Sequence, residues 1–194
     1  MSLADGFVAS IILFVMQSPL GSHQTLERVE LESGLIAFRC PETGGHWIPA
    51  EHYWRWHGTQ PEEERLPDDA EPVGSPVSEF DDMVKLCPES GTVMMRYRVG
   101  HGQAFRVDRS RTGGIWLDGG EWEALKAGNL HHAIHRIFTA PWQSAVRQEA
   151  LSEAWHTQLR ERLGDDLFTR LKALGKELAE HPHREAALAF LHGH

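Results

Sequence analysis

Two stretches of this chain share a short pattern: RCPETGGHWIPAEHYWRW, residues 39–56, and DRSRTGGIWLDGGEWEAL, residues 108–125. Each contains Thr-Gly-Gly-x-Trp followed by an aliphatic residue, and the copies lie 69 residues apart, since 112 − 43 = 69. The same offset, applied to earlier residues, pairs Ser18-Pro19 with Cys87-Pro88. The sequence separation between Ser18 and Cys40 is 22, and so is that between Cys87 and Arg109. Agreement at both ends without a gap predicts an internal duplication.

Each copy also predicts a small β-rich unit. Two strand-like runs flank a glycine-containing turn in each copy: 26–31 and 35–38 around Ser33-Gly34, and 93–99 and 104–107 around 100–102. Such runs favour hairpins. The paired glycines after Thr43 and Thr112 are typical of a tight turn whose backbone takes positive φ. Trp47 and Trp116 are expected to fold over the small sheets.

The last third of the chain predicts helices instead. Its apolar residues recur every four positions, as in Leu151, Trp155, Leu159 and Leu163, then Leu167 and Leu171, then Leu174 and Leu178. Gly164 is placed to end the first helix and Asp165 to cap the next, while Pro182 would start a short final helix. Packing of this stripe inside the molecule is favoured over an exposed partner surface, because soluble chains rarely leave such stripes bare.

The negative charge is concentrated in one segment. The chain of 194 residues has a formal net charge of −9, and residues 58–82 carry nine acidic side chains and one arginine, or −8. This segment, rich in Pro, Glu and Asp, predicts a solvated linker or loop. No basic stripe is present, which makes nucleic acid a disfavoured partner.

Cysteine usage and the N-terminus bear on localisation. Cys40 and Cys87 form no disulfide framework or CxxC pair, which suits a reducing compartment. The apolar run FVASIILFVM, residues 7–16, is too short to span a bilayer. A buried strand or an added leader is favoured over a secretion signal, because no Lys or Arg precedes the run. We expect a cytoplasmic protein without membrane association.

The run CPESG at Cys87, a hairpin and then GGIWLDGGEWEAL together resemble the zinc-ribbon family named after transcription factor IIB. The second copy matches the family frame at Gly113, Gly114, Trp116, Leu117, Asp118, Gly120 and Glu121. The first copy matches through Pro19, Cys40, Pro41, Gly44, Gly45 and Trp47. In that family two Cys-Pro knuckles supply four thiolates to one tetrahedral zinc. The resemblance covers roughly the first two thirds of the chain.

The ligand positions depart from the family pattern. The resemblance places them on Ser18, Gly21, Cys40 and Thr43 in the first copy, and on Cys87, Ser90, Arg109 and Thr112 in the second. Structural zinc needs four Cys or His ligands, and each copy offers one. We therefore expect no metal and no other cofactor. The aromatic residues and the helical tail would supply the core that zinc organises in the family.

Histidines leave one alternative open. His46 and His52 lie near Cys40 in sequence, and His131 and His135 in the run HHAIH would share one helical face. Two imidazoles at that spacing bind zinc only with further ligands. A solvated polar face opposite Leu130, Ile134, Ile137 and Phe138 is therefore favoured over a site.

No catalytic motif is present: the sequence has no GxSxG, P-loop, HExxH or GxGxxG. We predict a non-enzymatic protein-interaction module, a scaffold or adaptor that binds another protein. Its candidate contact surface is formed by the tryptophans Trp47, Trp54, Trp56, Trp116 and Trp122. A metal-binding regulator with rearranged Cys and His ligands is the alternative, and nucleic-acid binding is less favoured.

The predicted fold class is α+β, with two small zinc-ribbon-like modules followed by a helical segment. The expected parts are an extension (1–15), module 1 (16–57), the acidic linker (58–82), module 2 (83–128) and the helical region (129–194).

Overall fold

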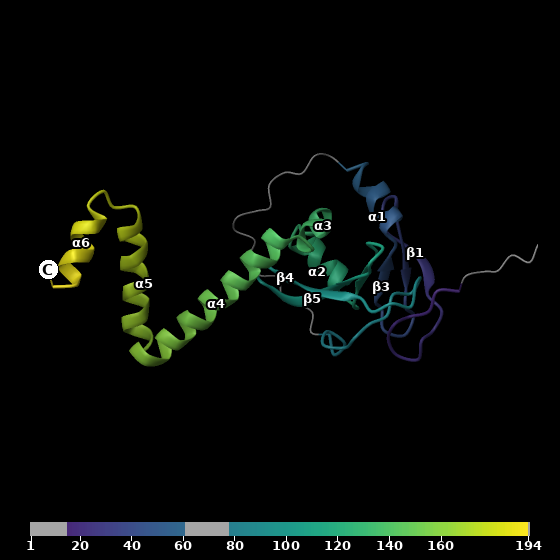
Figure 1. Cartoon of the computed structure of the whole chain (residues 1–194), viewed down its shortest axis with the longest axis horizontal. Coiled ribbons are helices and arrows are strands. Elements are labelled where there is room, and N and C mark those ends of the chain that lie inside the picture. The colour runs from purple at the N-terminus through teal and green to yellow at the C-terminus, as the bar shows by residue number, and fades with distance from the viewer. Residues whose placement is uncertain (1–14, 61–77, 194) are drawn as a thin grey trace, which may run out of the picture. The chain divides into compact units, whose positions relative to one another are not determined.

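The computed structural model describes residues 15–60 and 78–193 of the chain. It is an α+β fold, with a six-stranded antiparallel sheet in the N-terminal part and a helical C-terminal segment (Figure 1). The predicted fold class is confirmed. The chain divides into two compact units, which we name the sheet domain, Met1–Val146, and the helical domain, Arg147–His194.

The sheet takes three strands from each module. Module 1 supplies β1 (Glu27–Glu32), β2 (Leu35–Arg39) and β3 (His46–Ile48), and module 2 supplies β4 (Met95–Gly100), β5 (Gln103–Arg109) and β6 (Ile115–Leu117). Their order is β1-β2-β3-β6-β5-β4, so the two expected hairpins form the outer edges and β3 pairs with β6 in the middle. A helix follows each central strand: α1 (Ala50–His57) after β3 and α2 (Glu121–Ala127) after β6. The two halves of the sheet thus repeat the same order of elements.

The two modules join through their paired glycines and tryptophans. In the β3–β6 pair, Trp47 faces Trp116. A Cβ on Gly45 would lie 2.5 Å from Cζ2 of Trp116, and a Cβ on Gly114 would lie 2.3 Å from the indole ring of Trp47. Each indole therefore packs on the bare backbone of the other module. The first glycine of each pair, Gly44 or Gly113, takes the positive φ that the tight turn needs.

Alternation along the two central strands separates two apolar clusters. Trp47 and Trp116 belong to a cluster with Cys40, Cys87, Leu20, Leu26 and Met94. Their neighbours Ile48, Ile115 and Leu117 belong to the larger cluster, which includes Tyr53 and Trp56 of α1 and Trp122 and Leu125 of α2. Because successive strand residues point to opposite faces, the helices cover one face and the two cysteines lie behind the other.

Residues 129–146 belong to the sheet domain, although the predicted helical region begins at 129. After α2 the chain forms the 3₁₀ turn η1 (His131–Ala133), the short helix α3 (Ile134–Ile137) and the start of α4 (Ala140–Leu163). Trp142 donates its indole N–H to the carbonyl of Val99, 2.8 Å away, and Val146 packs on Gly100, where a Cβ would lie 2.4 Å from it. The first two turns of α4 are thereby fixed to β4.

The helical domain contains the rest of α4, then α5 (Asp165–Ala179) and α6 (Arg184–Leu191). Gly164, with φ 79°, separates α4 from α5 as predicted, and the final helix begins two residues after Pro182. Phe168 of α5 packs between His156 and Arg160 of α4 and is the one buried side chain among the described residues of this domain. No helix in the described ranges is both long enough and apolar enough to span a membrane.

The glycine–tryptophan contact predicts the effect of a single added methyl group. Gly114→Ala would force its Cβ into the Trp47 ring, so we expect the free energy of unfolding to fall by about 1–3 kcal/mol, as in other overpacked cores. Gly128→Ala is the matched control, because its Cβ would meet nothing closer than 3.5 Å and the glycine has negative φ. Urea unfolding of both variants measures the difference; equal stability would contradict the proposed role of Gly114.

Candidate functional site

The first knuckle brings three of its four expected ligand positions together. Cys40 accepts hydrogen bonds at its sulfur from the side chains of Ser18 and Thr43 and from the Thr43 N–H, the last over 3.5 Å. Burial raises the pKa of the Cys40 thiol, but these hydrogen bonds outweigh burial and leave the pKa below its ordinary value. Gly21 lies beside the Glu42 carboxylate, which accepts hydrogen bonds from Ser22 and so ties the two loops of the knuckle together.

The second knuckle has a different register from the predicted one. Phe38 faces Trp47 in one module and Asp108 faces Trp116 in the other, so the offset before the knuckle is 108 − 38 = 70 and after it 116 − 47 = 69. The expectation of an ungapped repeat is therefore wrong by one residue inside the turn. Ser110, not Arg109, takes the place of Cys40, and its N–H donates to the carbonyl of Gly114 as that of Cys40 donates to Gly45.

The Arg109 guanidinium lies over the Phe138 ring, 4.9 Å from the centroid, and beside Gly113 of the second knuckle. Ser90 lies at the exposed tip, where its hydroxyl is 2.9 Å from that of Thr92, while the Cys87 side chain is buried among apolar residues. Thr112 and Ser110 bond to each other through their hydroxyls, 2.8 Å apart.

The donor atoms in these knuckles do not fit tetrahedral zinc. Each knuckle has one thiol, and the hydroxyl of Ser110 is already committed to the N–H of Gly114 and to Thr112. Ser18 likewise accepts the N–H of Leu20 and bonds to Cys40. Neutral hydroxyls replace thiolates poorly, and here they serve the backbone that zinc would otherwise organise. Within residues 15–60 and 78–193, no three His, Cys, Asp or Glu side chains converge in a way that could hold a metal ion.

The tryptophans proposed as a contact surface are mostly inside the protein. Trp47, Trp56, Trp116 and Trp122 are all buried, so they form the core and not a binding face. Only Trp54 is accessible, with 50% of its surface exposed, and its ring packs against His135 at 5.3 Å. The interpretation as a surface is wrong for four of the five because the indoles fill the space between sheet and helices, or between the two knuckles.

A buried ionic cluster lies in module 2, and the sequence reasoning missed it. The ammonium of Lys85 is 2.8 Å from a carboxylate oxygen of Asp108 and 3.2 Å from one of Asp118, and all three side chains are buried. Asp118 also accepts hydrogen bonds from Ser78 and from the indole of Trp116. The hydrophobic pattern hides Lys85, because Val84 is 65% exposed while Lys85 is 1% exposed, the reverse of the usual preference.

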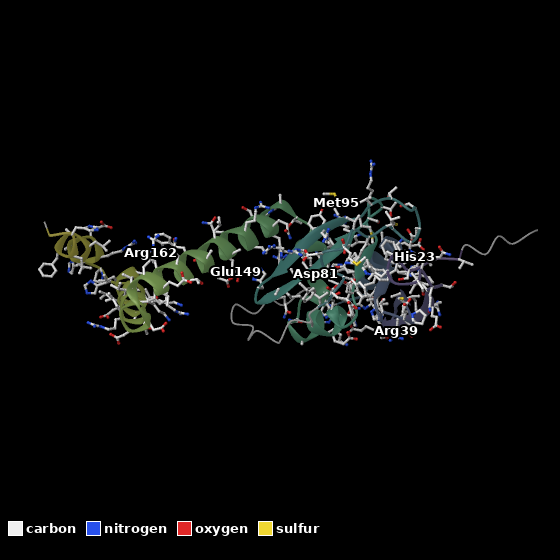
Figure 2. The ribbon with its side chains drawn as sticks, turned by 90° about the horizontal axis from the view of Figure 1, so that it is seen from below. His23, Arg39, Asp81, Met95, Glu149 and Arg162 are labelled. Atoms are coloured by element: carbon white, nitrogen blue, oxygen red, sulfur yellow. The ribbon has the colours of Figure 1, made fainter. Side chains whose placement is uncertain are left out.

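Ser78 and its neighbours were expected to be solvated linker. The described end of that segment, residues 78–82, instead packs on module 2: Asp81, labelled in Figure 2, accepts the backbone N–H and a guanidinium hydrogen bond of Arg106. Phe80 packs beside the two knuckle cysteines. Residues 61–77 of the predicted linker lie outside the described residues.

Two carboxyl groups of this cluster have perturbed pKa values. Burial, with the nearby Asp118 charge, raises the pKa of Glu121 to about 9, so this group is protonated at neutral pH. One of its oxygens accepts the Asp118 N–H, 2.7 Å away. Burial also raises the pKa of Asp108, against the opposing attraction of Lys85. The cluster is closed to solvent, which favours a structural role over acid–base catalysis.

Module 1 holds apolar residues where module 2 holds charges. Met16 and Lys85 correspond, because their carbonyls accept equivalent backbone hydrogen bonds from Leu26 and Met94. The offset of 70 before the knuckle equates Phe38 with Asp108, and the offset of 69 after it equates Pro49 with Asp118 and His52 with Glu121. These four residues of module 1 line an open depression of about 380 Å³, together with Glu89 and Thr112 of module 2. The sheet domain is therefore not symmetric in chemistry, although its elements repeat.

The histidine run does not form a solvated polar face. His131 is buried against Trp122 and His132, and burial lowers its pKa to about 4. His135 packs on the other side, where its Nδ1 is 2.9 Å from the Tyr53 hydroxyl. The expectation is wrong because residues 131–133 form a 3₁₀ turn that aims His131 inward. The two rings have different polar partners, Glu32 of β1 for His131 and Tyr53 of α1 for His135.

The helical domain exposes eight large apolar side chains, which we call the apolar stripe. It is made by α4, α5 and α6 through Leu151, Trp155, Leu163, Leu167, Leu171, Leu174, Phe190 and Leu191. Leu151 is 70% exposed, Trp155 56% and Phe190 81%. Leu151, Ala154 and Trp155 line one side of a shallow groove on α4. Within the helical domain itself Phe168 is the one buried side chain among the described residues, so these helices do not cover the stripe among themselves. Packing of the stripe inside the molecule stays a prediction.

Comparison with known proteins gives no match: neither a protein family, a curated protein nor a solved structure matches this chain significantly. The resemblance to zinc ribbons stays a prediction.

The ionic cluster predicts a large penalty for removing its cation. Lys85→Met would leave Asp108 and Asp118 buried without their counter-charge, so we expect a loss of about 3–5 kcal/mol in the free energy of unfolding. The double variant Lys85→Met/Asp108→Phe, which copies Met16 and Phe38 of module 1, should recover part of this loss. Denaturant unfolding of both gives the comparison; a double variant no more stable than the single one would argue against module 1 as its template.

Protonation of Glu121 predicts a pH dependence of stability. The folded state keeps this proton up to about pH 9, whereas an unfolded glutamate loses it near its ordinary pKa of 4.5. Between these values the folded state holds one more proton, so Glu121 makes the free energy of unfolding fall as pH rises. Glu121→Gln removes that contribution, and its stability relative to wild type should grow from pH 5 to pH 9. Thermal unfolding across this range measures it, and parallel curves would refute the assignment.

Proposed function

We propose that this chain is a non-catalytic protein-interaction module, a scaffold or adaptor, whose contact surface is the apolar stripe of the helical domain. The stripe carries the proposal: it contains eight large apolar side chains, each more than a third exposed, on three helices. Monomeric soluble proteins rarely expose large apolar patches unless these patches bind something. Trp155 is also of a residue type that is enriched at the energetic centres of protein interfaces.

The chemistry of the surroundings favours a protein as the partner. Charged residues of both signs flank the stripe on α4, among them Arg147, Glu149, Glu153, Arg160 and Glu161, and no basic band follows it. A mixed polar rim around an apolar centre is typical of protein interfaces, whereas nucleic acid requires a concentration of positive charge. We propose a cytoplasmic location, since the two cysteines are free and unpaired thiols suit a reducing compartment.

Substitution in the stripe tests the proposal. Trp155→Glu places a charge at the centre of the exposed surface and should abolish capture of the partner from a native cell extract by the full chain. Ser152→Glu is the matched control, because it adds the same charge to an exposed position of α4 outside the groove lined by Leu151 and Trp155. Quantitative mass spectrometry of the captured proteins gives the readout.

We expect at least one protein whose recovery falls tenfold or more with Trp155→Glu and stays at the wild-type level with Ser152→Glu. Circular dichroism confirms that both variants keep their helices. Identical protein sets from all three chains would exclude the stripe as the contact surface.

A further inference from the structure

The sheet domain has an open groove of about 530 Å³ between β1, β2 and α2. Val29, Leu31, His46 and Trp122 form its apolar and aromatic floor, and Arg39, Glu30, Glu123 and Lys126 form its rim. Figure 2 labels Arg39 at the periphery of the strand-rich part of the molecule. We call this feature the β1–α2 groove.

The same groove exists in the other half of the sheet, and there it is filled. The pairing of the strands equates Arg39 with Arg109 and Val29 with Tyr97, since Arg39 and Arg109 end their hairpins and Val29 and Tyr97 occupy the same ladder position. The 69-residue offset of the helices equates Trp122 with Tyr53, Glu123 with Trp54 and Lys126 with His57. Together these residues form the β4–α1 groove, and α3 lies in it.

The occupant of the filled groove shows what such a groove accepts. Phe138, which follows α3, stacks edge-on against Tyr97 at 5.1 Å and lies under the guanidinium of Arg109 at 4.9 Å. One turn earlier, His135 contacts Tyr53, Trp54 and His57, with ring centroids 6.1, 5.3 and 4.7 Å apart. Ile134 and Ile137 of the same helix are fully buried. The filled groove therefore holds a short helix with an aromatic residue on an arginine and a polar ring three positions before it.

The β1–α2 groove offers the same arginine without a ring. In the described part of the chain the cation–π pairs involve Arg109 and Arg160, and no aromatic ring lies over Arg39. The floor also contains His46, which is 7% exposed and whose Nδ1 has no hydrogen-bond partner among the described residues. Burial, the main cause, lowers the pKa of His46, so the ring is neutral and suits an apolar occupant.

The sequence of the segment that follows α1 does not supply a second copy of α3. By the helix offset, the residues that correspond to 131–138 are 62–69, EEERLPDD, which include a proline and no aromatic residue. The rim also differs from that of the filled groove, because Glu123 stands where Trp54 meets His135. A cationic residue three positions before the aromatic side chain would pair with Glu123. The best occupant therefore carries both residues at this spacing.

We propose that the β1–α2 groove binds a short amphipathic helix of a partner protein, with an aromatic residue stacked under Arg39 and a lysine or arginine three positions earlier beside Glu123. The mode is that of a helix laid in a groove, as α3 lies in the β4–α1 groove of the same domain. This proposal rests on the proposed binding function, but it uses a different surface from the apolar stripe.

The test is a fluorescence-anisotropy titration of the full-length protein with a labelled peptide of residues 130–140 carrying His135→Lys. Wild-type protein should bind this peptide, and Arg39→Ala should weaken binding about five- to tenfold, the range expected for loss of one cation–π contact. Arg109→Ala, the matched variant in the β4–α1 groove, should leave binding unchanged. A peptide that also carries Phe138→Ala should lose at least as much affinity for the wild-type protein as the parent peptide loses for the Arg39→Ala protein.

A charge exchange provides the second arm. The Glu123→Lys protein should bind the His135→Lys peptide more weakly than wild type does. A peptide with His135→Glu should bind that protein variant again, because the charges are exchanged. The proposal would be overturned if the wild-type chain did not bind the peptide at millimolar concentration. It would also be overturned if Arg109→Ala, and not Arg39→Ala, abolished binding, because the peptide would then replace α3 in the β4–α1 groove. Sedimentation equilibrium tests whether a second copy of this chain occupies the groove. Self-association that Arg39→Ala abolishes would assign the groove to that second copy. Stripe-dependent capture through Trp155 is measured separately, so either proposal can fail alone.

Discussion

The sheet domain depends on the reciprocal packing of Trp47 on Gly114 and of Trp116 on Gly45. The strands β3 and β6 contain three residues each, too few to hold two modules together by backbone pairing alone. The indoles add the buried area that this short ladder lacks, and they cover the two knuckles whose thiols belong to the same cluster. Because each glycine receives the tryptophan of the other module, neither module can bury its own indole without its partner. The six-stranded sheet is thus the smallest unit in which both aromatic rings are enclosed.

Around this shared centre the two modules have diverged in how they stabilise the same positions. Module 2 uses Lys85, Asp108 and Asp118, an arrangement that favours one conformation because any departure exposes an unpaired buried charge. Module 1 uses Met16, Phe38 and Pro49 and leaves an open depression beside them. The hydroxyls of Ser18 and Ser110 in the two knuckles accept hydrogen bonds from backbone N–H groups. Packing and hydrogen bonds accordingly stabilise both knuckles of this domain.

Periodicity and turn residues were sufficient to predict the elements, but not which side chains the assembled sheet buries. The hairpins, the break at Gly164 and the α+β class follow from local pattern, because short strands and glycine turns are encoded within a few residues. The register of the second knuckle was wrong by one position, since TGGxW is identical in both copies and conceals the deletion just before it. Lys85 and the tryptophans were misjudged for a different reason: their burial is decided by contacts between residues far apart in the sequence, which a single window of sequence does not contain. The missed signal for Lys85 is its place in a strand-like run where Val84 and Leu86 take the exposed phase.

The two halves of the sheet repeat the same elements and therefore also the same surfaces. This repetition explains why the β1–α2 groove is present in addition to the filled β4–α1 groove. Each half of the sheet presents an arginine at the end of its second strand and a helix alongside, and so each creates a concave apolar site. The chain continues from α2 into α3 and fills one of these sites with Phe138, whereas the acidic segment after α1 has no aromatic residue to fill the other. Among the described residues, the apolar floor of the β1–α2 groove and the Arg39 guanidinium lack the contacts that their equivalents make in the filled groove. An external helix would complete it at little conformational cost to the sheet, since the filled groove forms on the same backbone framework.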